Sequence, residues 1–160
     1  LMEPGYIDGH EGEWLSTPKQ FESMARIYWN EGYAIHVHVT GDLGLELAID
    51  TLEKLQFEKP RFNHGFTLEH FGLSTPEQVY RLARLGANVS ANAYYVHELS
   101  DIYANLSVGY ERASSMSRIG SCFRERVTTA LHSDFTMAPA QPLMSMWVAV
   151  NRINEKGDVT

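Results

Sequence analysis

The chain has 160 residues, of which 44% are hydrophobic and 21% charged, a balance typical of a globular domain with a buried core. A formal net charge of -7 argues against a nucleic-acid surface, because phosphate contacts need clustered Lys and Arg and the 13 basic residues are scattered. No apolar run approaches the roughly 18 residues that cross a bilayer, and Cys122 has no partner for an intrachain disulfide. These features favour a cytoplasmic protein with neither membrane nor nucleic acid among its partners.

Three patterns organise the first part of the chain. Residues 1–16 are rich in Gly, Pro and acidic residues and are expected to form a loop that leads into the first regular element. Thr17 followed by Pro18 is typical of a helix start, and Gly32 is placed to end that helix. Residues 33–39 alternate in character, which predicts a strand with His36 and His38 on one face.

The alternation of strand and helix continues to the carboxyl end. An apolar stripe after Gly41 predicts a helix that ends before Pro60, and the next strand is expected at 67–71. Thr75 followed by Pro76 repeats the helix-start signature, and a strand is expected at 87–91. Further along the chain, helices are expected at 101–106 and 118–126, a strand at 127–133 and an apolar helix at 142–152. Residues 17–160 are therefore expected to form the βα units of one domain.

The order of these elements predicts an α/β fold. Four strands that are each followed by a helical pattern make βαβ units, whose crossovers give a parallel sheet. A complete eightfold barrel needs about 250 residues, whereas a doubly wound open sheet fits in about 150. Length alone therefore favours an open sheet, which would bind a small ligand at its switch point without a metal.

Three residues that can bind a metal fall at or near the carboxyl ends of predicted strands, where parallel α/β folds place their ligands. His38 and His70 are 32 positions apart, and Asp134 follows 64 positions later, so one strand without a ligand lies between. Two imidazoles and a carboxylate suit Zn, with Fe or Mn as alternatives. A buried histidine or a turn aspartate would explain each residue alone, so spacing leaves the two interpretations about equal.

Five segments, in this order, resemble the amidohydrolase superfamily: residues 38–42 (HVTGD), 68–70 (LEH), 85–90 (LGANVS), 132–134 (HSD) and 142–152. The likeness is to the branch with the N-substituted formamide deformylases and the exoenzyme regulatory proteins. It implies a partial, TIM-like (β/α)8 barrel in which this chain supplies the last four βα units, strands five to eight. It also implies that His38, His70 and Asp134 bind a divalent metal, and that Asp134 is the catalytic base for hydrolysis by a metal-activated water.

The comparison with that family also shows absences and departures. The family's first strand carries a His-x-His pair, and strands one to four have no counterpart in this sequence. His36 and His38 could be mistaken for that pair, but residues 41–42 after them argue against this register. His132 stands where a small residue is expected, on the same face as Asp134, as either a spare ligand or filler.

The remaining histidines have weaker assignments. His97 is expected in the loop after the strand at 87–91, where it could contact a substrate, although an exposed loop histidine is the simpler interpretation. His36 is expected to pack in the barrel interior below His38, and His10 and His64 to face solvent.

Two hypotheses of function follow. The first is a segment of a metal-dependent amidohydrolase that hydrolyses an amide or formamide-type C-N bond of a small molecule and is inactive in isolation. The alternative is a non-catalytic metal- or partner-binding α/β domain of a regulatory protein. A half barrel exposes two sheet edges and an open interior, which predicts a homo-oligomer.

Overall fold

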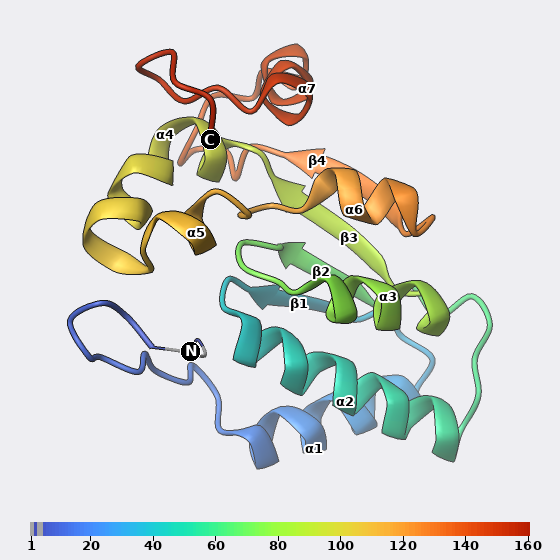
Figure 1. The fold of residues 1–160 in the computed structure, drawn as a ribbon. Coiled ribbons are helices and arrows are strands. Elements are labelled where there is room, and N and C mark those ends of the chain that lie inside the picture. Colours follow the sequence, from blue (N-terminus) through green and yellow to red (C-terminus); the bar gives the residue numbers. More distant parts are fainter. Residues whose placement is uncertain (1, 3–4) are drawn as a thin grey trace.

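The computed structural model describes residue 2 and residues 5–160, and it shows a four-stranded sheet with helices between the strands (Figure 1). In chain order the elements are α1 (Pro18–Asn30), β1 (His36–Val39), α2 (Asp42–Glu58), β2 (Thr67–His70), α3 (Pro76–Leu85), β3 (Asn88–Asn92), α4 (Tyr94–Ile102), the π-helix η1 (Tyr103–Ser107), α5 (Tyr110–Ala113), α6 (Ile119–Arg124), β4 (Thr128–His132) and α7 (Pro142–Asn151).

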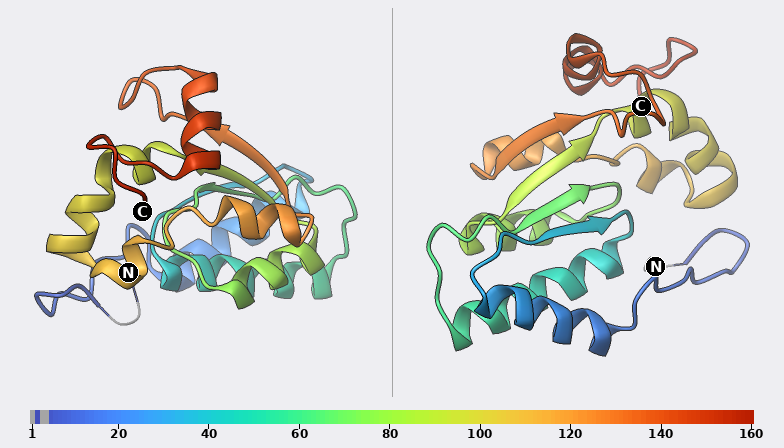
Figure 2. Two further views of the ribbon diagram at one scale, coloured as in Figure 1. Left: turned by 45° about the horizontal axis from the view of Figure 1, so that its top comes forward. Right: turned by 180° about the vertical axis from the view of Figure 1, so that it is seen from behind.

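The four strands are parallel and lie in sequence order, β1-β2-β3-β4. His38 pairs with Glu69, Glu69 with Ser90, and Ser90 with Ala130. Helices α2 and α3 make the crossovers between successive strands and lie on one side of the sheet (Figures 1 and 2). This arrangement confirms the predicted α/β class and the consecutive parallel strands of a partial barrel.

Two helices begin where the Thr-Pro pairs predict. The Thr17 side chain accepts a hydrogen bond from the Gln20 backbone N–H, and the Gln20 side chain accepts one from the Thr17 N–H. Thr75 and Gln78 form the same reciprocal pair at the start of α3. Each capping box satisfies backbone donors that a helix start leaves without intrahelical partners. Local sequence therefore fixes where the elements before β1 and β3 begin.

The main hydrophobic core lies between α2 and α3 and the face of the sheet that they cover. Leu45, Ile49 and Leu52 of α2 are fully buried, as are Leu68 of β2 and Val89 of β3. Burying a side chain of this size contributes about 1.5–3 kcal/mol relative to leaving it in water. Because side chains alternate along a strand, the neighbours of Leu68 and Val89 face the other side.

The opposite face of the sheet is polar and largely open. His36, His38 and Thr128 are exposed there, and Glu69 lies partly buried among them. The expectation that His36 packs in the interior is wrong for this chain, because its side chain is 58% exposed and contacts Glu69 at the open face. A face built from polar side chains can remain in contact with water, as on one side of many antiparallel sheets.

The connection between β3 and β4 differs most from expectation. Instead of a loop followed by a short helix at 101–106, α4 begins at Tyr94, directly after β3. The Asn92 side chain accepts the Tyr94 backbone N–H at 3.0 Å, which supports this early helix start. The helix then continues into the π-helical turn of η1, whose wider hydrogen-bonding pattern no local sequence signal indicated.

Segments at the two ends of the chain pack against this connection. The Ile7 N–H donates to the Ser107 carbonyl at 2.8 Å, so the loop before α1 lies beside η1 (Figure 2). The Arg152 guanidinium donates to the carbonyls of Ser114 and Met116, each at 3.0 Å, and anchors the end of α7. Among the described residues, no helix combines the length and the apolar character needed to span a bilayer.

Candidate metal site

The predicted ligands lie at one end of the sheet. His38 is the penultimate residue of β1, His70 is the last residue of β2, and Asp134 lies two residues after β4 ends. This is the carboxyl edge of a parallel sheet, where the side chains of neighbouring strands converge.

The three side chains also lie close together in space. The ring centroids of His38 and His70 are 4.2 Å apart. His70 Nδ1 lies 3.8 Å from Asp134 Oδ2. His70 therefore lies between His38 and Asp134. Asp134 follows β4, which is separated from β2 by β3.

Unusual backbone geometry aims two of these side chains. His70, Phe71 and Asp134 have φ values of 70°, 52° and 56°, in the left-handed region that non-glycine residues seldom occupy. Strict alternation would place His70 on the helix-covered face with Leu68, yet its ring contacts His38 on the open face. The left-handed turn therefore redirects the imidazole toward the candidate site, at a cost of about 1–2 kcal/mol per residue.

The loop after His70 is held close to β1. Leu73 N–H donates to the Thr40 carbonyl at 2.8 Å, and a Cβ at position 72 would lie 2.7 Å from the same oxygen. Only glycine allows the two backbones to approach this closely at Gly72. The close approach ties the end of β2 to the end of β1, next to both histidines.

The environment of His70 favours its neutral form. The residue is 8% exposed. Burial, followed by the nearby His38 ring, lowers the pKa of His70, and the Asp134 carboxylate only partly opposes this shift. Neutral imidazole is the form that coordinates a metal ion, so the site is suited to a cation rather than to a second proton.

The side chains at the candidate site are of types that bind divalent metals. His70 Nδ1 is buried, has no hydrogen-bond partner within the described residues and lies on the side of Asp134. Such a nitrogen is rarely left unpaired in a folded protein, and a metal would satisfy it. The ligand set is not closed, because no group of three His, Cys, Asp or Glu side chains in the described part of the chain is already arranged to hold an ion.

A family model matches almost the whole chain. The model described as "Amidohydrolase family" matches residues 4–160. The chain belongs to the amidohydrolase family.

Three individual proteins resemble this amidohydrolase chain. Protein LONG AFTER FAR-RED 3 of Arabidopsis thaliana is 26% identical over 161 residues, which are 99% of this chain and 27% of that protein. A crystal structure of an uncharacterised metal-dependent hydrolase from Pyrococcus furiosus is 25% identical, with a TM-score of 0.79 over 95% of this chain and 31% of that one. A second such hydrolase, from Pyrococcus horikoshii OT3, is 23% identical, with a TM-score of 0.81 over 100% of this chain and 31% of that one. The chain spans about a third or less of each relative.

His132 also lies beside the predicted metal ligands. Its ring centroid lies 5.0 Å from that of His70, nearly perpendicular to it. Its Nδ1 accepts a hydrogen bond from the Asp134 backbone N–H at 3.1 Å, and its Nε2 is buried without a hydrogen-bond partner in the described residues. The residue read from the sequence as spare ligand or filler therefore contacts the site directly.

Sequence reasoning missed Tyr95 as a neighbour of the site. Its ring stacks on His70, with centroids 6.1 Å apart and ring planes 16° apart. Burial, Tyr103 and Asp134 together raise the pKa of Tyr95 to about 12, so its hydroxyl stays protonated at neutral pH. The signal available was its position three residues after β3 ends, where a side chain can reach the carboxyl edge of the sheet.

The remaining predicted histidines have structural partners. His97 lies within α4 rather than in a loop, with Nδ1 3.0 Å from the Ile153 carbonyl and its ring against Trp147. His64 is buried at 2% exposure, so the expectation that it faces solvent is wrong. The ring of His64 packs against that of Trp29, with the two centroids 5.3 Å apart. His10 is exposed, as expected.

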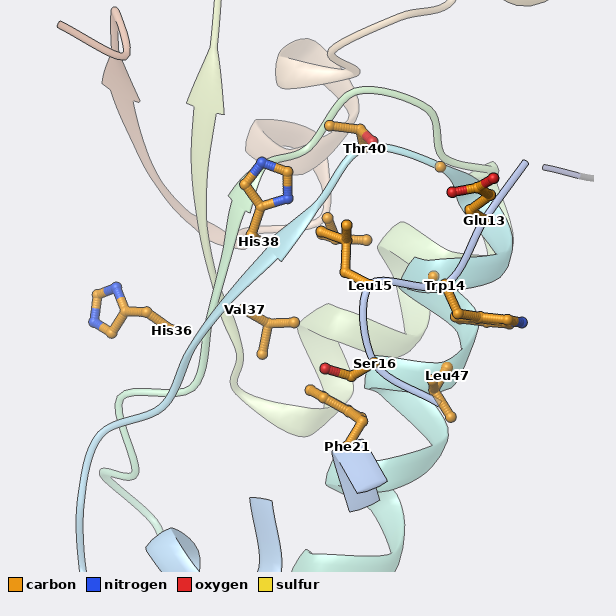
Figure 3. Close-up of a pocket in the computed structure, with 13 residues that line it drawn as sticks. Glu13, Trp14, Leu15, Ser16, Phe21, His36, Val37, His38, Thr40 and Leu47 are labelled. Atoms are coloured by element: carbon orange, nitrogen blue, oxygen red, sulfur yellow. The ribbon is translucent and has the colours of Figure 1, made fainter. Parts of the chain in front are cut away.

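A groove follows β1 beside the site. Its volume is about 300 Å³, and Leu15, Phe21, Val37 and Leu47 contribute apolar side chains to it. Figure 3 shows His36 and His38 projecting from one side of β1 while Val37 points to the other, toward Phe21. His38 therefore stands at the border between the polar open face and an apolar groove that could receive part of a small molecule.

Proposed function

We propose that this chain is the metal-binding segment of an amidohydrolase that hydrolyses a C-N bond, in an amide or a formamide-type small molecule. The observation that carries the proposal is the convergence of His38, His70 and Asp134 around the buried, unpartnered Nδ1 of His70. The finer likeness of the sequence to the formamide deformylase branch supports the choice of bond.

The proposed roles follow from the chemistry of each side chain. His38 and His70 hold the metal as neutral imidazoles, and Asp134 completes the set with a carboxylate oxygen. When bound, a divalent cation lowers the pKa of water and polarises a carbonyl oxygen. The Asp134 side chain is 42% exposed, so it can accept the proton of the attacking water and return it to the leaving nitrogen. Tyr95 fixes the orientation of His70 by stacking on it.

Zinc is the proposed metal, with iron or manganese as the alternatives. Two imidazoles and one carboxylate form a set that zinc commonly takes in hydrolases, with one position open to water. The same ligands suit Fe and Mn, so the metal is decided by analysis rather than by ligand type. Elemental analysis of the purified chain after reconstitution with each metal separately would identify the one retained.

Hydrolysis tests the proposal. The resemblance implies a barrel with further strands, so the assay compares the isolated chain with a longer polypeptide that supplies such strands, using N-substituted formamides and anilides. We expect turnover only in the longer protein. Asp134→Asn preserves the size of the side chain and removes the base, so turnover should fall about 100-fold or more. Metal-independent turnover, or turnover unchanged in Asp134→Asn, would contradict the proposal.

A second candidate is a non-catalytic domain that binds a metal or a partner. The observation in its favour is that the described residues hold no closed set of three ligands. Turnover distinguishes the two candidates, because a non-catalytic domain would fail to hydrolyse every amide in the panel even in the longer polypeptide, whether or not it retains zinc.

We also propose that the chain self-associates. Among the described residues β1 and β4 are the edge strands of the sheet, and edge strands present backbone groups that can pair with another chain. The apolar groove along β1 adds a surface that a second copy could cover. Light scattering coupled to size-exclusion chromatography should show a dimer, and a folded monomer at micromolar concentration would contradict this.

A further inference from the structure

His132 has a hydrogen-bonding arrangement that assigns its proton. Its Nδ1 accepts the Asp134 backbone N–H at 3.1 Å. A backbone N–H can only donate, so Nδ1 must present its lone pair and cannot carry a hydrogen. The neutral ring then carries its hydrogen on Nε2, which makes Nε2 a donor.

This tautomer is incompatible with metal coordination through either nitrogen. The lone pair of Nδ1 is already directed at the Asp134 N–H, and Nε2 has a hydrogen where a ligand would need a lone pair. His38 and His70 carry no such constraint in the described structure. Proximity to His70, at 5.0 Å between ring centroids, therefore does not make His132 a third imidazole ligand.

His64 provides an internal comparison for the same arrangement. Its Nδ1 accepts the Phe66 backbone N–H at 3.0 Å, also two residues further along the chain. Its Nε2 lies 3.0 Å from the Leu85 carbonyl, to which it donates. Both rings thus accept through Nδ1 and donate through Nε2, but the donor of His64 has an acceptor within the chain.

The Nε2 of His132 has no such acceptor. The atom is buried, and the described residues offer it no hydrogen-bond partner. The nearby Glu69 carboxylate is engaged elsewhere, with Oε1 2.6 Å from His36 Nδ1 and a further hydrogen bond from Ser90. A buried N–H without a partner costs free energy and is rare in folded proteins. The residue His132 also lines a pocket of about 350 Å³, together with Asp134 and the start of α7.

We propose that His132 is a substrate-contacting residue that donates its Nε2–H to an oxygen of the bound molecule and does not bind the metal. The acceptor would be a carbonyl or carboxylate oxygen, as in an amide, a formamide or the carboxylate that hydrolysis releases. The part that concerns substrate rests on the proposed hydrolytic function, whereas the tautomer of His132 does not.

The first test reads the tautomer of His132 directly. Two-bond ¹H–¹⁵N NMR correlations of the isolated chain distinguish a protonated Nε2 from a protonated Nδ1, and they are recorded without metal and with one equivalent of zinc. We expect the Nε2–H pattern for His132 in both spectra, with zinc-induced shifts confined to His38 and His70. A protonated Nδ1, or a zinc-bound Nε2 at His132, would overturn the proposal.

The second test asks whether the donor holds an oxygen ligand. Formate is titrated into the zinc-loaded chain and into two variants, each of which retains only one of the two hydrogen-bonding groups of the imidazole. His132→Asn retains an acceptor near the Nδ1 position and removes the donor, whereas His132→Gln places an amide N–H near the Nε2 position. We expect formate affinity to fall about 10-fold in His132→Asn and to stay within about 3-fold in His132→Gln, with zinc affinity unchanged in both.

The outcomes keep this proposal separate from the metal hypothesis. Equal formate affinity in the wild-type chain and in both variants would overturn the donor role even if zinc binds. Lost zinc affinity in His132→Asn and His132→Gln, with normal thermal unfolding, would overturn the claim that His132 is not a ligand. If the wild-type chain binds no zinc, the proposed metal function fails, while the metal-free spectrum still decides the tautomer of His132.

Discussion

Zinc should stabilise the folded chain, and His38→Gln should remove much of that effect while His36→Gln leaves it intact. A ligand that binds only the folded state at 100 times its dissociation constant adds about 2.7 kcal/mol to the free energy of unfolding. For a chain of 160 residues, each kcal/mol raises the melting temperature by about 2–4 °C. Saturating zinc should therefore raise the melting temperature of the wild-type chain by about 5–11 °C.

The two histidines make a matched pair for this test. Both are exposed, lie on β1 and project from the same face (Figure 3). Only His38 contacts His70, whereas His36 Nδ1 lies 2.6 Å from Glu69 Oε1. A 10-fold loss of zinc affinity in His38→Gln would leave about 1.4 kcal/mol of stabilisation at the same zinc concentration, or about 3–6 °C.

Differential scanning fluorimetry with and without zinc measures these shifts, and a zinc titration by calorimetry gives the affinities. Equal zinc-induced shifts in His38→Gln and His36→Gln would refute the assignment of His38. The absence of any shift in the wild-type chain would refute the metal site as a whole.

Three further predictions concern the fold. Leu52→Ala, at a fully buried position of α2, should lower the free energy of unfolding by about 2–5 kcal/mol in urea denaturation, while exposed Leu106→Ala should change it by less than about 0.5 kcal/mol. Arg126 has a φ of 60° just after α6, so Arg126→Gly should stabilise the chain by about 0.5–1 kcal/mol and Arg126→Ala should not. Burial raises the pKa of Cys122 from about 9 to about 11, so iodoacetamide should modify it about 100-fold more slowly at pH 8 in the folded than in the unfolded chain. Because the folded state holds that proton more tightly, the contribution of Cys122 to stability is complete below pH 9 and is lost between pH 9 and 11.

Much of the fold could be predicted from local sequence. The Thr17-Pro18 and Thr75-Pro76 pairs begin α1 and α3 through capping boxes that need only neighbouring residues. The strands were predicted within a few residues of their observed bounds, because alternation and flanking glycines are local signals as well. The α4 start at Tyr94 was missed, since it depends on a side-chain contact from Asn92.

The sequence indicated which residues form the candidate site, but not how they are oriented. Strand ends and family resemblance selected His38, His70 and Asp134, and the structure brings all three to one edge of the sheet. The left-handed backbone at His70 could not be read from the sequence, because histidine rarely adopts it without a tertiary reason. The acceptor role of His132 Nδ1 depends likewise on the folded turn after β4.

The burial of His64 could not be predicted from the sequence either. No periodic pattern surrounds it, so an exposed loop position was the default expectation. Its ring is buried because the backbone carbonyl of Leu85, 21 residues away, and the Phe66 N–H satisfy both of its nitrogens. Nonlocal hydrogen bonds of this kind decide whether a polar ring can leave water.

Crystals of the chain soaked in zinc would show whether His38, His70 and Asp134 bind the metal, through anomalous difference maps recorded above and below the zinc absorption edge. We expect one strong peak bounded by His38, His70 and Asp134, with His132 Nε2 outside the coordination shell. A map without a peak at the carboxyl edge of the sheet, or with zinc bound only at other residues, would contradict this.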